Sequence, residues 1–108
     1  MDERRKNRRK VVNSRVRISH SNFGTIETKT RDISDSGVLI LSNDELKQVN
    51  INDEIQLIFL DSGELDIIFN LSVVRMDEVG IGLKFLNYEK NGEVFAISDL
   101  RDVWQKQT

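Results

Sequence analysis

The chain has 108 residues, of which 38% are hydrophobic and 31% are charged, a composition typical of one soluble globular domain. It has no cysteine and one histidine, which excludes a disulfide scaffold, a cysteine nucleophile and a metal site built on thiolates or on several histidines. No apolar run is long enough for a membrane span or a signal peptide, so we expect a cytoplasmic protein without membrane insertion.

The formal net charge of −2 conceals a strong asymmetry. Residues 1–17 hold eight of the 16 basic residues and only two acidic ones, so this segment carries +6 and the rest of the chain carries −8. Residues 1–12 lack a hydrophobic period, and repulsion among their cations favours a flexible arm. We therefore divide the chain into an arginine-rich arm at 1–12 and one domain at 13–108. The arm could bind an external anion or rest on its own domain.

Apolar and polar residues alternate through the first part of the domain, which is typical of half-buried β-strands. The pattern predicts a first strand at residues 15–19, a turn at 22–24 and a second strand at 25–31. The Asp, Ser and Gly residues of the segment 32–37 are turn formers, and a short apolar strand follows at 37–41.

A polar loop comes next, with a helical turn expected around residues 45–48. Alternation then resumes and predicts a strand at 55–59. The segment 61–63 has the composition of a short hairpin loop, with glycine in a left-handed conformation. Long strands are expected at 65–76 and, after an acidic turn, at 79–85.

The C-terminal segment changes to a helical period. Val94, Ile97, Leu100 and Trp104 follow one another at spacings of three and four, which predicts an amphipathic α-helix, although Gly92 weakens its first turn. About six short strands and one helix, without strand–helix–strand alternation, predict an all-β fold. We expect a small antiparallel barrel with the helix packed on it.

The sequence offers no combination of residues that is typical of a catalytic site. His20 is expected at the surface end of the first strand, and the adjacent acidic pairs fall at solvated turns. Neither a GxxxxGK[ST] loop nor a GxGxxG turn after a strand is present. The sequence therefore argues against an enzyme, and we expect no metal and no cofactor.

Two motifs carry groups that could bind a nucleotide. The first is Arg5-x-x-x-Arg9, because arginine forks match phosphate oxygens and the O6/N7 edge of guanine. The second is Asp32-x-Ser34-x-x-Gly37, in which the carboxylate accepts from guanine N–H groups and glycine permits close approach to the backbone. Each motif alone is weak, since a basic run is usually a solvated tail and the second pattern is usually a turn.

In combination and order, the motifs resemble the PilZ domain family of bacterial cyclic di-GMP receptors. The resemblance covers nearly the whole chain and includes a late strand, Gly80-Ile81-Gly82-Leu83-Lys84-Phe85. It implies a six-stranded antiparallel barrel of the split-barrel type with a C-terminal helix. It also implies that Arg5 and Arg9 clamp guanine and phosphate, and that Asp32, Ser34 and Gly37 contact a guanine from the barrel surface.

The resemblance extends to two further residues and has two departures. Arg4 matches an additional arginine that in some relatives favours a stacked pair of nucleotides, and Gly82 is a further candidate contact. The chain has no proline after the arm, which leaves the arm more flexible. Asn52 stands where many relatives have glycine in the central turn, and asparagine tolerates that geometry.

The resemblance implies a receptor that orders its arm on binding cyclic di-GMP and signals to an unidentified partner protein. An alternative is a PilZ-like adaptor that binds proteins and no nucleotide. A third interpretation, a nucleic-acid binder, rests on the basic arm alone, because the body is acidic and most aromatic residues fit core positions.

Overall fold

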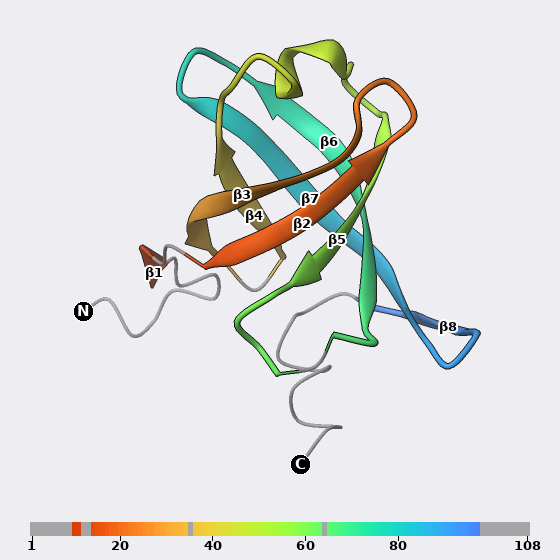
Figure 1. The fold of residues 1–108 in the computed structure, drawn as a ribbon. Helices are drawn as coiled ribbons and strands as arrows, with labels where there is room; N and C mark the ends of the chain where they lie inside the picture. The colour runs from red at the N-terminus through yellow and green to blue at the C-terminus, as the bar shows by residue number, and fades with distance from the viewer. Residues whose placement is uncertain (1–9, 12–13, 35, 64, 98–108) are drawn as a thin grey trace.

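The computed structural model of the protein describes residues 10–11, 14–34, 36–63 and 65–97. Eight strands occur in this part of the chain, and Figure 1 shows that most of them wrap around one interior. Their bounds are β1 Lys10–Val11, β2 Arg15–His20, β3 Gly24–Ile33, β4 Gly37–Leu41, β5 Glu54–Phe59, β6 Ile68–Met76, β7 Gly80–Lys90 and β8 Glu93–Ala96.

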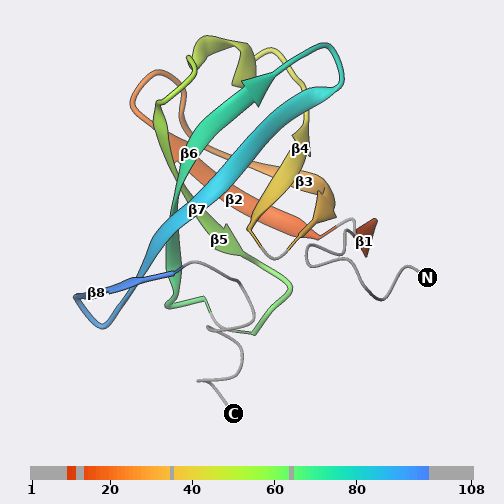
Figure 2. The same ribbon diagram turned by 180° about the vertical axis from the view of Figure 1, so that it is seen from behind.

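Six of these strands close into a barrel. The pairing runs β3–β2–β5–β6–β7–β4, and a further pairing of β4 with β3 closes the ring. Every pairing is antiparallel. The two opposite views show the ring from the β2–β3 side (Figure 1) and from the β6–β7–β4 side (Figure 2). The predicted six-stranded antiparallel barrel is confirmed.

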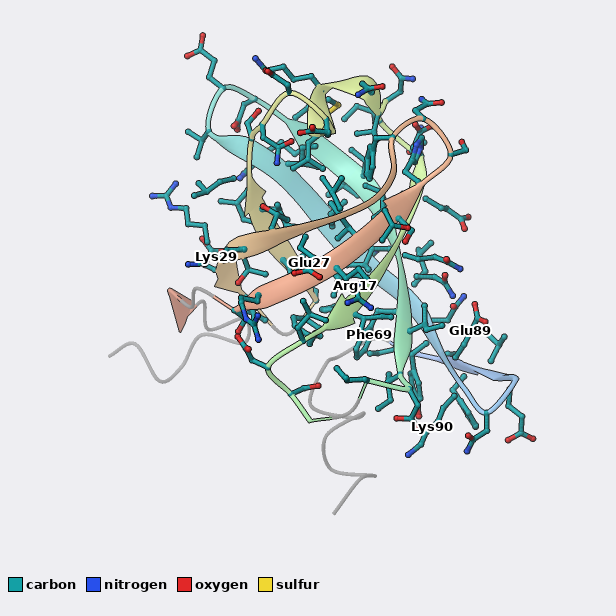
Figure 3. All side chains as sticks on the ribbon, in the orientation of Figure 1. Arg17, Glu27, Lys29, Phe69, Glu89 and Lys90 are labelled. Carbon is teal, nitrogen blue, oxygen red and sulfur yellow. The ribbon has the colours of Figure 1, made fainter. Side chains whose placement is uncertain are left out.

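The alternating apolar residues of the strands meet inside the barrel. Val16, Ile18, Leu57 and Leu71 are fully buried, as the period of two requires. Phe69 lies at the centre, with ring centroids 5.3 Å from Phe59 and 5.3 Å from Phe85. Figure 3 shows Phe69 directed into the interior, whereas Arg17 and Glu27 lie on the outer face of β2 and β3.

The C-terminal helix is absent at residues 93–96, where the structure has β8 instead. Asn91 and Gly92 have φ values of 55° and 82°, the double left-handed conformation of a two-residue hairpin turn. This turn folds β8 back on β7 and stacks Phe95 on Tyr88, with ring centroids 5.0 Å apart. The predicted helical stripe was therefore wrong at its start, and its later residues, Leu100 and Trp104, lie outside the described part.

Two other predicted elements changed their bounds. The segment expected as a short hairpin loop at 61–63 is part of a longer connection, and β6 begins at Ile68 instead of residue 65. Asp61 fixes this connection to β2, because it accepts hydrogen bonds from the backbone N–H and the guanidinium of Arg15. The helical turn expected around residues 45–48 is confirmed as a 3₁₀ turn at Leu46–Gln48.

His20 ends β2 as expected, but its side chain is only 8% exposed. Its Nδ1 accepts from the backbone N–H of Asn22, so Nε2 carries the proton and donates to Asp53 at 3.1 Å. Asp53 also accepts from the N–H of Asn50, and the neighbouring Asn52 has φ of 77°. The histidine is therefore a structural clamp on the turn before β5. No helix in the described residues could cross a membrane.

Candidate functional site

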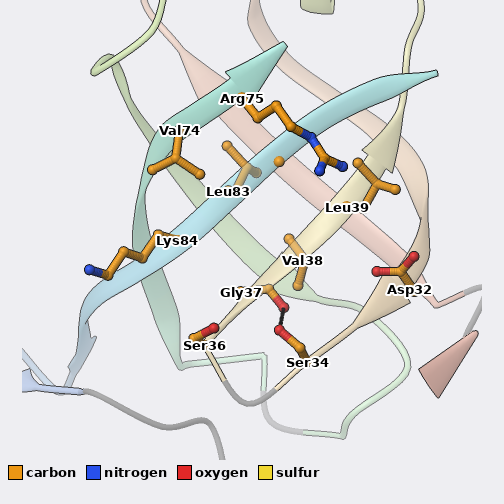
Figure 4. Close-up of a pocket in the computed structure, with 11 residues that line it drawn as sticks. Asp32, Ser34, Ser36, Gly37, Val38, Leu39, Val74, Arg75, Leu83 and Lys84 are labelled. Atoms are coloured by element: carbon orange, nitrogen blue, oxygen red, sulfur yellow. Dashed lines mark hydrogen bonds between the residues drawn. The ribbon is translucent and has the colours of Figure 1, made fainter. Parts of the chain in front are cut away.

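A pocket of about 370 Å³ lies on the outer surface of the barrel, over β4, β6 and β7 and beside the end of β3. Figure 4 shows it with the side chains that surround it. The second sequence motif and the late glycine strand both contribute to it, although more than 40 residues separate them. Its lining residues are Asp32, Ser34, Ser36, Gly37, Val38, Leu39, Val74, Arg75, Gly82, Leu83 and Lys84.

Asp32 sits within the sheet and not in the turn that the sequence suggested. It is a residue of β3, flanked by Val11 of β1 on one side and Leu39 of β4 on the other. It is only 7% exposed, so its position is defined by two neighbouring strands. A carboxylate held in this way presents hydrogen-bond acceptors to the pocket at a fixed place.

Ser34 and Gly37 close the tight turn between β3 and β4. The backbone N–H of Ser34 donates to the carbonyl of Gly37 at 2.9 Å, and the Ser34 hydroxyl donates to the same carbonyl at 3.3 Å. The hydroxyl proton is thus used by the turn, and its lone pairs remain able to accept from a ligand. Asp35, the middle residue of the turn, lies outside the described part.

Gly37 has a packing role that the motif alone did not indicate. A Cβ built on it would overlap the carbonyl oxygen of Leu83, far closer than the 3.0 Å that real Cβ atoms respect. Gly37 pairs with Lys84 in the β4–β7 ladder, so this glycine allows two backbones to approach. The same is true of Gly80, whose Cβ would overlap the carbonyl oxygen of Ile40.

Gly82 differs from these two glycines, because the atoms nearest to it belong to a side chain and not to the backbone of a neighbouring strand. A Cβ at this position would meet the Cβ of Arg75 at 3.4 Å and its Nε at 3.8 Å, which is ordinary contact. Gly82 pairs with Arg75 on one side and with Leu39 on the other. The missing side chain therefore leaves room for Arg75 to extend from β6 across β7 towards Leu39 (Figure 4).

Arg75 forms an ion pair with Asp77, with its Nε 3.5 Å from Oδ2. The other oxygen of Asp77 accepts from the N–H groups of Val79 and Gly80 in the β6–β7 turn. These backbone hydrogen bonds, first from Gly80 and then from Val79, hold the pKa of Asp77 below its ordinary value of 3.8. The Arg75 side chain is 55% exposed.

The root of the arginine arm lies next to this pocket. Lys10 and Val11 form β1, which pairs antiparallel with Ile33 and Asp32 of β3. The last part of the predicted arm is therefore a short strand beside the motif aspartate. Arg4, Arg5 and Arg9 lie outside the described residues.

The pocket combines one buried carboxylate with two cationic side chains, Arg75 and Lys84. Leu39 and Val74 add apolar surface, Leu39 being 6% exposed and Val74 52% exposed. Such a site suits a ligand that has a flat ring, N–H donors and negative charge. Within the described residues, no group of three or more His, Cys, Asp or Glu side chains could hold a metal ion.

Comparison with known families agrees with this arrangement. The sequence profile of the PilZ domain matches residues 3–95, which is most of the chain. The chain belongs to the PilZ domain family. Members of this family are ligand-binding and adaptor modules, among them receptors for cyclic di-GMP. The predicted family is thus confirmed.

The same fold occurs in a solved structure. The PilZ domain described here is similar to the Bacillus subtilis inhibitor of motility, MotI/DgrA, with a TM-score of 0.57 and 23% sequence identity. The match covers 76% of this chain and 42% of that one, so this chain spans less than half of the length of that protein. A comparison with curated proteins finds no significant match.

Sequence reasoning had missed Arg75, Lys84 and Val74. Simple alternation along β6 places Arg75 on the same face as Phe69 and Val73, which would bury it inside the barrel. The pairing of β6 with β7 shifts its register between Val73 and Arg75, and this irregularity turns Arg75 outwards. An arginine at an expected core position was the signal that could have revealed it.

Proposed function

We propose that this PilZ domain is a cytoplasmic receptor for cyclic di-GMP. In this proposal Arg5 and Arg9 of the arm bind the nucleotide together with Asp32, Ser34 and Gly37 of the barrel. The ligand has two guanines and two phosphates, so it offers N–H donors for the Asp32 carboxylate and acceptors for arginine forks.

The observation that carries the proposal is the pairing of β1 with β3. Val11 lies opposite Asp32, so the arm leaves the barrel beside the pocket. Arg9 directly precedes Lys10, and consecutive Cα atoms are about 3.8 Å apart. Arg5 is separated from Lys10 by at most about 18 Å of extended chain. The chain between Lys10 and each motif arginine is thus short enough for both side chains to contact a ligand held over Asp32.

The proposed switch is the ordering of the arm over bound nucleotide. The cations of the arm repel one another without an anion and are drawn together by the phosphates. The ligand favours the closed state by its stronger binding to that state, and closure changes the surface offered to a partner protein. The similar solved structure is named an inhibitor of motility, and an effector role of that kind would suit the proposed switch.

Isothermal titration with cyclic di-GMP tests the proposal. Loss of a charge-assisted fork should weaken binding at least about tenfold in Arg9→Ala, whereas Arg17→Ala should bind like the wild type. Arg17 is a suitable control because it is an exposed arginine paired with Glu27 on the outer face of β2. Equal binding by wild type and Arg9→Ala would contradict the proposed clamp. A wild-type protein that binds no nucleotide yet captures a partner would be an adaptor instead.

A further inference from the structure

Arg75 belongs to neither sequence motif, yet its side chain is part of the lining of the candidate site. Its side chain lines the pocket and extends over Gly82 towards Leu39, which is the cross-strand neighbour of Asp32. An arginine at this point lies on the barrel itself. It can therefore contact a guanine recognised by Asp32 without any movement of the arm.

We propose that Arg75 is a third arginine of the ligand site, which packs its planar guanidinium against the guanine held by Asp32. This inference rests on the proposed function, because it assumes that cyclic di-GMP binds in this pocket. Guanidinium groups stack on aromatic rings and are less strongly hydrated than ammonium groups, so the contact is specific to arginine.

The way in which Arg75 is held supports this role. Asp77 contacts Arg75 through Nε, which lies on the stem side of the guanidinium. Among the described residues, the structure records no hydrogen bond from the terminal nitrogens Nη1 and Nη2. These two groups carry four of the five N–H donors of an arginine side chain. The ion pair thus directs the side chain and leaves its binding edge available.

Asp77 is itself fixed by the backbone. Its Oδ1 accepts from Val79 at 2.9 Å and from Gly80 at 3.1 Å, so the β6–β7 turn sets the direction of its carboxylate. Asp77 is therefore a positioning residue, which acts on the ligand through Arg75. A rigid anchor lowers the entropy that an exposed arginine loses when it binds.

Gly82 completes the arrangement. Its nearest neighbours, where a side chain would begin, are two atoms of Arg75. A longer side chain here would lift the guanidinium away from β7 and out of line with Leu39. This geometry gives Gly82, a ligand contact expected from the sequence, an indirect role as the surface on which Arg75 lies.

A purely structural explanation of Arg75 is weaker. An exposed ion pair such as Arg75–Asp77 contributes little to stability. The Asp77 carboxylate is already satisfied by two backbone N–H groups, so the turn does not depend on Arg75. A structural role would predict a change in the unfolding temperature on substitution, and our proposal predicts a change in affinity alone.

The test is calorimetric titration of cyclic di-GMP into wild type, Arg75→Met, Arg75→Lys and Arg17→Met. Methionine retains an unbranched stem over Gly82 and removes the guanidinium, and lysine restores the charge without the planar fork. We expect binding about tenfold weaker in Arg75→Met and only partly restored in Arg75→Lys, at unchanged unfolding temperature. Arg17→Met, with the same loss of charge on another face, should remain within about twofold of wild type.

The outcomes separate the two proposals. Wild-type binding together with Arg75→Met binding within about twofold of it would overturn the role of Arg75 and leave the receptor assignment intact. A full return of affinity in Arg75→Lys would also overturn it, since charge alone would then suffice. Absence of binding by the folded wild-type protein would instead refute the proposed function.

Discussion

Substitution of Gly37 by alanine should unfold the barrel more easily, for reasons of packing and independently of any ligand. The new Cβ would overlap the carbonyl oxygen of Leu83 and lie 3.3 Å from the Cα of Lys84. These are backbone atoms, which cannot move aside as a flexible side chain does. The start of β4 must therefore separate from β7.

The cost follows from the hydrogen bonds at that point. Separation breaks the 2.9 Å bond from the N–H of Phe85 to the carbonyl of Ser36 and strains the turn bond from Ser34 to Gly37. A buried N–H left without a partner costs about 1–3 kcal/mol, so Gly37→Ala should lose about 2–4 kcal/mol. For a domain of this size the melting temperature should fall by about 10–25 °C.

Two other glycines serve as controls in the same thermal and urea denaturation experiments. Gly80→Ala should be destabilised as much as Gly37→Ala, because its Cβ would overlap the carbonyl oxygen of Ile40, although Gly80 is outside the pocket. Gly82→Ala should change the free energy of unfolding by less than about 1 kcal/mol, since its Cβ meets only the exposed Arg75 side chain. A Gly37→Ala protein as stable as Gly82→Ala would refute the packing argument.

Two further predictions concern the carboxylates that bond to the end residues of β2, Arg15 and His20. Asp61 has a pKa below its ordinary value of 3.8, first because the backbone N–H of Arg15 donates to it and then because the Arg15 guanidinium does. The stabilisation that Asp61 contributes is therefore present above pH 3.8 and is lost as the pH falls through the lower folded value. In urea titrations, Asp61→Asn should lose less stability than wild type as the pH falls below about 4, and equal losses would contradict this. Asp53→Ala removes the hydrogen-bond acceptor of the mostly buried His20 and should lower the free energy of unfolding by about 1–3 kcal/mol. Asp53→Asn keeps an acceptor oxygen and should retain most of the stability. An equal loss in both variants would show that the contact between His20 and Asp53 depends on charge.

The barrel could be predicted from sequence because apolar and polar residues alternate clearly along its strands. The strand predicted at 37–41 coincides with β4, and the inward residues expected around Phe69 are buried. The helix predicted in the C-terminal segment was wrong at its start because the spacing of Val94 and Ile97 was taken as a helical stripe. The Asn91–Gly92 pair is a strong hairpin signal and should have outweighed that spacing.

The candidate site was predicted less completely than the fold. One pocket is lined by four of the predicted residues, Asp32, Ser34, Gly37 and Gly82. The local motifs suggested these residues individually, but the pairing of the strands is what brings them together. Arg75 stands out in the sequence as an arginine at an expected core position, but its outward direction could not be derived, because the irregularity in β6 depends on its pairing with β7. A period of two cannot indicate where such a shift occurs.

The closed ring of β2 to β7 also limits how this protein can meet another one. Each strand of the ring has a hydrogen-bonded neighbour on either side, so the ring itself offers a partner little free strand edge to extend. A partner that binds the ring must therefore read side chains on its outer surface, where a nucleotide and an arm laid across β4 and β7 would present a different shape and a different charge.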